Sequence, residues 1–474
     1  MKFQTGKVLN DDDLKMIHDA SLDILENIGV KIMHPEVFSL AMNNGARPGS
    51  SDNIVYLPRD LVMRCLDQCP KKIVLCDRKG RSADLTPGGS RVYLTGNALN
   101  RTDGDNVVKP ITRNDFCDYV RLVDSLDQVF GMVGTFITDV PPKARDFAGF
   151  RSMLENTDKH LRPCLYSAEG AKVIMEMADV VSGGKPYEEM PFFSFGYSIV
   201  SPLCWSHEAC EIFKQTAGHK IPLTINSEPL AGGTSPVTLA GSMVTGNAEV
   251  LSGIVINQII EPGRPLIHNI GFAHLFDMYE TIALTGAPEN SLMAVAGAEL
   301  AAHYGLPSAS WLGTDSMTVD GQSCLEKMLT IFTQAASGIN FIWGVGNIEA
   351  TKCYSPVMAV LDNEMLGATE RFLRGFEVND NTLALDTIYD LGFNGDFLSA
   401  EHTFDNFRTE NRYNTILNRT IRDKWQNAGN LTSEDKARKI VADIYNKPGT
   451  LKIEGSIRDK LIKIENNRIA GMGK

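Results

Sequence analysis

Pro265-Leu-Ile-His-Asn-Ile270 is a short apolar run with polar side chains near its end, and the pattern after it predicts a helix over Phe276–Tyr304 with a break near Pro288. Similar runs recur along the chain, each followed by a polar turn and a helical stretch: Val129–Ile137, Arg162–Ser167, Phe192–Ile199, Pro222–Asn226, Pro307–Leu312 and Ile339–Val345. Strands that alternate with helices are typical of βαβ units and a parallel sheet. With Arg91–Thr95 as an eighth strand, the pattern predicts an α/β fold, a (β/α)8 TIM barrel.

The sequence on either side of these runs predicts further elements. Residues 1–90 contain amphipathic helical patterns, the first over about Asp11–Gly29, and short strand patterns such as Ile73–Cys76. Residues 351–474 are charged and helical in pattern. We therefore expect an N-terminal α/β extension at 1–90, a TIM-barrel core at 91–350 and a helical C-terminal segment at 351–474.

The composition excludes several classes of protein. The 474 residues carry 58 acidic and 46 basic side chains, a net charge of -12, which disfavours nonspecific binding to nucleic acid. Nine separate cysteines without a CxxC motif are typical of reduced thiols in a cytoplasmic protein. The N-terminus lacks the apolar segment of a signal peptide, and no stretch approaches ~18 consecutive apolar residues. We expect a cytoplasmic protein that binds neither nucleic acid nor a membrane.

A barrel of this kind places its chemistry at the C-terminal ends of its strands. Aromatic side chains gather at these predicted ends, and converging rings attract a quaternary ammonium group through their quadrupoles. On any single strand, an aromatic side chain is more often part of the core. The aromatic candidates for cation binding are Tyr197, Trp311, Phe341 and Trp343.

Polar side chains accompany the aromatic ones at the same strand ends. Glu228 and Asp315 could balance a cation, although a hydrogen bond within its own loop is an equally supported role for Asp315. Amide and imidazole groups could bind a carboxylate. These remaining candidates are Asn226, His268, Asn269 and Asn347.

Known catalytic motifs are missing from the sequence. There is no HExxH, no zinc-type spacing of His and Cys, no GxSxG and no complete phosphate-binding loop. A zinc site that combines His268 with a cysteine and a glutamate stays open as an alternative. The glycine-rich loop with Gly232 and Gly233 could offer backbone N–H groups to an anion or a bulky cofactor, or could simply form a tight turn.

Several longer segments resemble one family. They are Ile17-His-Asp-Ala-Ser-Leu-Asp-Ile-Leu-Glu-Asn-Ile-Gly-Val30, Gly246-Asn-Ala-Glu-Val-Leu-Ser-Gly-Ile-Val-Ile-Asn-Gln-Ile-Ile-Glu-Pro-Gly-Arg-Pro265, Gly344-Val-Gly346 and Glu401-His-Thr-Phe-Asp-Asn-Phe-Arg408. Over nearly its whole length, the chain resembles the trimethylamine methyltransferase superfamily of corrinoid-dependent methyltransferases.

The resemblance implies a barrel enzyme that moves a methyl group from a methylated amine to the Co(I) corrinoid (cobalamin) of a small partner protein. One branch of the superfamily contains pyrrolysine, and this chain, which has no unusual residue, resembles the branch without it. Members of that branch act on quaternary amines such as glycine betaine, proline betaine or carnitine. We expect no tightly bound metal, a homo-oligomer, and a corrinoid that approaches Gly232 and Gly233.

Two alternatives remain at this point. The first is a zinc-dependent corrinoid methyltransferase for another methyl donor, in which the metal would activate a thiol or alcohol. The second is a non-catalytic betaine-binding protein that keeps the barrel.

Overall fold

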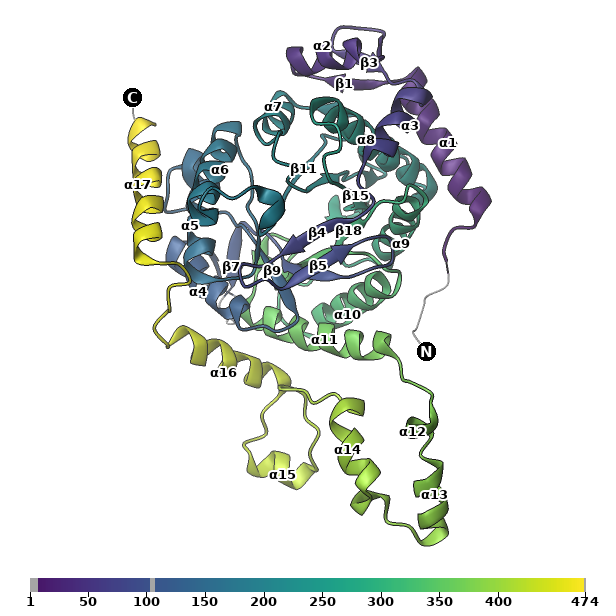
Figure 1. The fold of residues 1–474 in the computed structure, drawn as a ribbon, viewed down its shortest axis with the longest axis vertical. Coiled ribbons are helices and arrows are strands. Elements are labelled where there is room, and N and C mark those ends of the chain that lie inside the picture. Colours follow the sequence, from purple (N-terminus) through teal and green to yellow (C-terminus); the bar gives the residue numbers. More distant parts are fainter. Residues whose placement is uncertain (1–6, 103–106, 473–474) are drawn as a thin grey trace.

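The computed structural model describes residues 7–102 and 107–472, and its centre is an eight-stranded parallel barrel (Figure 1). The strands follow the order β10-β9-β6-β19-β18-β15-β13-β11. A parallel bridge between Leu161 and Phe193 joins the two ends of this order and closes the barrel. The strands are β6 (Val92–Thr95), β9 (Val129–Val133), β10 (His160–Arg162), β11 (Phe195–Ser198), β13 (Leu223–Asn226), β15 (Leu266–Gly271), β18 (Ser308–Trp311) and β19 (Phe341–Val345).

Helices cover the outside of the barrel and alternate with its strands (Figure 1). This arrangement confirms the predicted (β/α)8 barrel, including the strand near Arg91–Thr95. The helices are α4 (Arg113–Asp124), α5 (Arg145–Asn156), α6 (Ala168–Ser182), α7 (His207–Gln215), α8 (Leu239–Ile260), α9 (Pro288–His303), α10 (Gly321–Ala336) and α11 (Pro356–Arg374).

Two sequence predictions for the barrel need correction. The strand predicted at Arg162–Ser167 is instead β10 at His160–Arg162, because Pro163 has no N–H to continue the ladder. The first part of the predicted helix Phe276–Tyr304 is instead a hairpin of β16 (His274–Asp277) and β17 (Ile282–Leu284). Helix α9 begins only at Pro288, whose fixed φ suits a first helical position.

Helix α8 is long and apolar enough to cross a membrane by length and composition alone, but 72% of its apolar window is buried inside the protein. It packs against α1, α3 and β15. Two of its glycines allow this close packing: a Cβ on Gly246 would lie 2.7 Å from Cγ2 of Ile270, and a Cβ on Gly253 would lie 2.5 Å from Cγ2 of Ile225. The apolar surface of α8 is therefore that of a core helix.

The N-terminal elements pack on one side and one end of the barrel. Strand β1 pairs in parallel with β12 (Cys204–Trp205). The β4–β5 hairpin packs against Val92, Phe130 and Phe341 at the N-terminal ends of the barrel strands. These elements are α1 (Asp11–Asn27), β1 (Val30–Ile32), α2 (Pro35–Asn43), β2 (Arg47–Pro48), β3 (Ile54–Tyr56), α3 (Arg59–Gln68), β4 (Ile73–Cys76) and β5 (Ser82–Leu85). The hairpin closes that end, so the opposite end is left for chemistry.

Loops at the C-terminal ends of the barrel strands form two small sheets. One combines β14 (Leu230–Ala231) with β16 and β17. The other combines β7 (Asn100–Thr102), β8 (Val108–Pro110), β20 (Asn347–Ile348) and β21 (Cys353–Tyr354). These sheets stiffen the rim of the barrel mouth.

The C-terminal helices fall into two groups. Helix α16 packs on α11 and α4, and α17 packs on α6 and α5, whereas α12 to α15 extend away from the barrel in the lower part of Figure 1. Their bounds are α12 (Asp380–Leu383), α13 (Leu385–Leu391), α14 (Glu401–Glu410), α15 (Arg422–Asn427), α16 (Ser433–Tyr445) and α17 (Gly455–Gly471).

Candidate active site

A cavity of about 480 Å³ opens at the C-terminal ends of the barrel strands. Aromatic residues, one arginine, one glutamate and two asparagines line it, which is a mixture suited to a small polar ligand. The lining includes Asn97, Arg162, Cys164, Tyr166, Gly196, Tyr197, Ser198, Asn226, Glu228, Phe272, His274, Trp311, Trp343 and Thr351.

Aromatic rings from neighbouring strands meet at this mouth. Trp311 and Trp343 lie in register on β18 and β19, and the ring of Phe272 contacts both, with centroids 5.4 and 4.7 Å away. Tyr197, near the end of β11, also lines the cavity, but its ring packs outward against Phe213 on α7, with ring centroids 6.3 Å apart. Phe341 is fully buried below Trp343 and does not line the cavity. Three of the four aromatic candidates thus line the cavity, and the rings of Trp311 and Trp343 form one wall of it with Phe272.

The floor of the cavity holds Arg162, which the sequence analysis did not single out. Its guanidinium carbon lies 4.8 Å from the ring centre of Trp343 and 5.2 Å from that of Phe341. Its Nη1 donates to the carbonyl of Phe195 at 2.7 Å, and Nη2 donates to Oγ1 of Thr224. Burial lowers the pKa of Arg162 to about 10, so the side chain is charged at neutral pH.

Glu228 supplies an acidic group to the same cavity. It follows β13, and its Oε1 accepts a hydrogen bond of 2.6 Å from Ser198 at the end of β11. Burial raises the pKa of Glu228, and the nearby Glu249 raises it further. A cation bound beside Glu228 would favour its ionised form, because opposite charges lower the pKa of a carboxyl group.

The two predicted asparagines act as a pair. Asn226 lines the cavity, and its Oδ1 accepts from Nδ2 of the fully buried Asn269 at 2.9 Å. The backbone N–H of Gly271 donates to Oδ1 of Asn269, also at 2.9 Å. Asn269 therefore orients Asn226, which leaves the Nδ2 group of Asn226 for a ligand.

The structure places His268 behind the barrel wall rather than in the cavity. Its Nε2 lies 3.1 Å from Oδ1 of Asn247 on α8, and Nδ2 of Asn247 donates to Ser21 and Tyr304. Burial lowers the pKa of His268 to about 3, so it stays neutral. His274, on β16, is the histidine that lines the cavity, and burial lowers its pKa to about 4.

Asp315 and Asn347 also lie outside the lining. Asp315 accepts hydrogen bonds from the backbone of Thr285 at 2.6 Å and of Gly286 at 3.0 Å, which fixes the segment before α9. This geometry matches the loop role that the sequence left open for Asp315. Nδ2 of Asn347 donates to the carbonyl of Asn97 at 2.7 Å and holds that part of the rim.

The glycine-rich loop forms a tight turn between β14 and α8. The N–H of Gly232 donates to the carbonyl of Ser235, and the N–H of Gly233 donates to that of Leu230. Gly233 is exposed, and a Cβ on Gly232 would make only van der Waals contact with Met278 and Val237. The loop therefore presents a backbone surface with little side-chain cover.

Metal ligands do not gather in the parts of the chain that the structure describes. No three His, Cys, Asp or Glu side chains there are grouped as a metal ion requires. The neighbours of His268 are Asn247 and Tyr304, not a cysteine and a glutamate. These residues do not fit the zinc site that the sequence left open.

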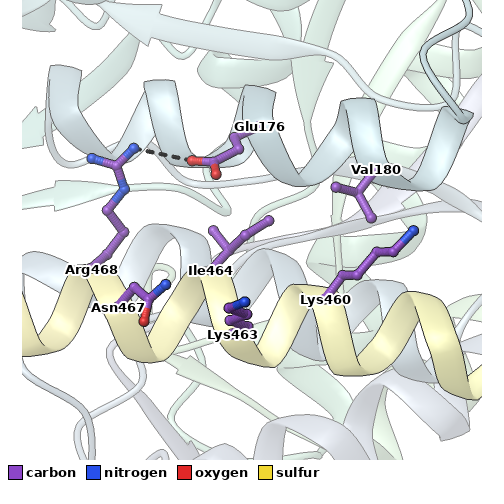
Figure 2. A pocket seen from close by; sticks show the side chains of 7 residues that line it. All are labelled: Glu176, Val180, Lys460, Lys463, Ile464, Asn467 and Arg468. Carbon is purple, nitrogen blue, oxygen red and sulfur yellow. Dashed lines mark hydrogen bonds and ion pairs between the residues drawn. The ribbon is translucent and has the colours of Figure 1, made fainter.

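A second cavity of about 600 Å³ lies outside the barrel, between α6 and α17 (Figure 2). Most of its lining side chains are long and polar, and Nη2 of Arg468 pairs with Oε2 of Glu176 across it at 3.1 Å. It contains no aromatic ring and no buried charged group. The barrel mouth is therefore the better candidate for chemistry.

Comparisons with known proteins agree with this architecture. The profile of the family Trimethylamine methyltransferase (MTTB) matches residues 1–473. Trimethylamine methyltransferase MttB from Desulfitobacterium hafniense (strain DSM 10664 / DCB-2) is 31% identical over 89% of this chain and 85% of its own length. Glycine betaine methyltransferase from strain Y51 of the same species is 28% identical over 88% of each chain. The crystal structure of Methanosarcina barkeri monomethylamine methyltransferase (MtmB), 14% identical, covers 93% of this chain and 96% of its own with a TM-score of 0.50.

Proposed function

Since the chain belongs to the trimethylamine methyltransferase family and is a methyltransferase, we propose that it moves a methyl group from a quaternary amine to the Co(I) corrinoid of a small partner protein. The observation that carries this proposal is the mouth itself, where aromatic rings and Glu228 surround a cavity of about 480 Å³. Rings and a carboxylate are the groups that bind a methylated cation.

The proposed reaction needs neither a nucleophile nor a general acid from this chain. A quaternary ammonium loses a methyl group to leave a neutral tertiary amine, so the leaving group needs no proton. The partner's corrinoid, when bound, supplies the nucleophile. The residues of this chain bind the ammonium, orient its C–N bond toward the mouth and exclude water. His274, kept neutral by burial, adds polarity to the lining without adding a competing positive charge.

We take a betaine, such as glycine betaine, proline betaine or carnitine, as the methyl donor. The likeness to a glycine betaine methyltransferase supports this choice, as does the combination of Arg162 with Glu228 in one cavity. All 474 positions hold standard amino acids, which supports a reaction without pyrrolysine.

The remaining parts of the proposal concern location and partners. The mouth between the two rim sheets would receive the corrinoid protein, with the bare backbone of Gly232 and Gly233 near the corrin ring. Among the described residues, the nine cysteines are all free thiols, in keeping with a cytoplasmic protein. We also propose a homo-oligomer.

The decisive experiment mixes the purified enzyme with a reduced corrinoid protein and a panel of methylated amines. Methylation of Co(I) changes the absorbance of the corrinoid. We expect this change when one betaine is the methyl donor, and no change in a control reaction without the enzyme. Stoichiometric zinc in the active protein would favour the zinc-dependent alternative. Betaine binding without methyl transfer to any corrinoid protein would make the chain a binding protein.

A further inference from the structure

Arg162 is a buried cation without a counter-anion. It is 6% exposed, and no carboxylate pairs with it among the residues that the structure describes. Among the described residues, the other two buried arginine or lysine side chains each have a carboxylate nearby: Nε of Arg264 lies 3.6 Å from Glu261, and Nζ of Lys327 lies 3.0 Å from Asp362. Because burying an isolated charge is costly, an unpaired Arg162 needs a functional explanation.

The surroundings of Arg162 are shaped to hold its head group at the cavity. The guanidinium lies over Gly196, where any Cβ would overlap its Nη2. The rings of Phe341 and Trp343 lie beside it, and Phe195 and Thr224 each accept one hydrogen bond. A guanidinium has five N–H donors, so three have no partner among the described residues. Because Arg162 lines the cavity, a ligand can reach it.

The chemistry of these free donors selects one kind of ligand group. A guanidinium binds a carboxylate through two parallel, charge-assisted hydrogen bonds, and does so most strongly where water is excluded. Asn226, whose Oδ1 already accepts from Asn269, has its amide N–H groups left for a second contact with the same anion. Glu228 lies elsewhere in the lining and forms no ion pair with Arg162.

We propose that Arg162 binds the carboxylate of the substrate, so that the enzyme accepts methylated ammonium compounds that carry an acid group and discriminates against simple methylamines. This inference rests on the proposed function for the ammonium end of the ligand. It assigns the two charges of a zwitterion to different partners, the carboxylate to Arg162 and the cation to Glu228 with the ring of Trp311. Because Arg162 already contacts Trp343, we assign that ring to the carboxylate end.

Three probes separate the two ends of the ligand. Glycine betaine has both charges, tetramethylammonium has only the cation, and 3,3-dimethylbutanoate is an uncharged-head analogue that has only the carboxylate. Titration calorimetry on the full chain gives the dissociation constant of each. For the unaltered protein, we expect glycine betaine to bind more tightly than tetramethylammonium.

The test variant is Arg162→Gln. We expect its affinity for glycine betaine and for 3,3-dimethylbutanoate to fall roughly 10- to 100-fold, the range for a lost hydrogen-bonded charge contact. Its affinity for tetramethylammonium should change less than about twofold, because the cation does not use Arg162. Arg162→Lys keeps the charge but loses the bidentate geometry. Its affinities for glycine betaine and 3,3-dimethylbutanoate should therefore lie between those of the unaltered protein and those of Arg162→Gln.

Two further variants keep the test decisive. Arg264→Gln removes an equally buried arginine outside the cavity, and should lower the melting temperature while leaving the ratio of the three affinities unchanged. If Arg162→Gln does not fold, Gly196→Ala displaces the guanidinium without removing it, and should weaken only the two carboxylate probes.

The outcomes distinguish this inference from the proposed function. Equal losses for tetramethylammonium and glycine betaine would make Arg162 a structural residue and overturn the inference. So would equal affinity of the unaltered protein for these two ligands. Arg162-dependent binding of 3,3-dimethylbutanoate, without methyl transfer from any ammonium compound, would support the carboxylate site while refuting the proposed function.

Discussion

Glu228 is buried enough that its pKa lies above the ordinary value, yet it lines the cavity that we assign to a cation. Its single described side-chain partner is the hydroxyl of Ser198, which cannot neutralise a carboxylate. A bound ammonium group can, and the pair would form in a partly dry site where Coulomb attraction is stronger than in water. We therefore expect the carboxylate of Glu228 to pair with the bound ammonium group in a site that excludes most water.

Glu228→Gln should weaken binding of tetramethylammonium by about 1–2 kcal/mol, roughly 5- to 30-fold, because the amide has no negative charge. In the unaltered protein, affinity should also fall as pH is lowered from about 7.5 through the raised pKa, since the protonated acid no longer attracts the cation. Calorimetry over this range gives both results. A variant with the same affinity and the same pH profile as the parent would exclude Glu228 from the site.

The buried, neutral state of His268 predicts how the stability of the protein depends on pH. Its folded pKa of about 3 lies below its ordinary value of 6.5, so only the unfolded chain binds the proton between these values. The parent protein should therefore lose about 1.4 kcal/mol of stability per pH unit from this residue as pH falls below about 6.5. His268→Gln lacks this loss, so the stability difference between parent and variant should narrow by that amount. Urea unfolding from about pH 6.5 to 5 measures it, and parallel curves would contradict the buried, neutral state.

At the scale of elements, tertiary contacts explain the Gly344-Val-Gly346 motif at the end of β19. Gly344 and Gly346 have φ values of +108° and +85°, and an added Cβ would meet the backbone of Leu312 or the hydroxyl of Tyr119. The buried Lys327 donates to the carbonyl of Gly344 at 2.7 Å and pairs with Asp362, which accepts from the N–H of Gly346. The motif is therefore a backbone requirement of the rim.

Lys327→Met should destabilise the protein by about 3–5 kcal/mol, because it leaves Asp362 buried without its cation. Chemical unfolding measures the free energy. The double variant Lys327→Met with Asp362→Asn provides the control, since it removes both charges and should recover part of the loss. Asp362→Asn alone completes the comparison. If the destabilisations of the two single variants add up to that of the double variant, Lys327 and Asp362 are not coupled.

At the scale of the whole molecule, the described residues of 376–410 form an apolar arm without a core. None of their side chains is buried, and large apolar residues are strongly exposed, including Leu398 at 85% and Tyr389 at 79%. These residues carry eight acidic side chains and one arginine, whereas 411–431 carry four basic side chains and one aspartate. Apolar surfaces of this extent mark interfaces. The opposite charges of the two segments suit a two-fold pairing of copies, in which each segment meets the other.

This arrangement predicts that the arm is where copies of the chain associate. Replacing Leu385, Ile388 and Leu398 together by serine should lower the mass measured by light scattering during size-exclusion chromatography. The matched control changes Met16, Leu325 and Leu329, which are equally apolar and exposed but lie on helices of the barrel and extension. We expect the control to keep the mass of the parent. A parent protein that is monomeric at micromolar concentration would refute both the arm interface and the homo-oligomer.

Much of the fold was predictable because it depends on local patterns. Short apolar runs that alternate with helices specify parallel strands, and eight of them close a barrel. The error at Arg162–Ser167 arose because Pro163 ends the strand, so the apolar residues after it belong to the cavity loop. The division at residues 90 and 350 stays a prediction, since elements from all three parts pack on one another.

The residues of the candidate site were only partly predictable, for a physical reason. The sequence by itself determined which side chains end up near the C-terminal ends of the strands, since chain order and strand period fix this. It could not determine which of them face the cavity. His268 and Asn269 are neighbours, yet one contacts α8 behind the barrel wall and the other orients Asn226 inside it, because successive side chains of a strand point to opposite faces. Only the closed barrel decided that Arg162 lies across Gly196 from Thr224, because that contact joins strands far apart in the sequence.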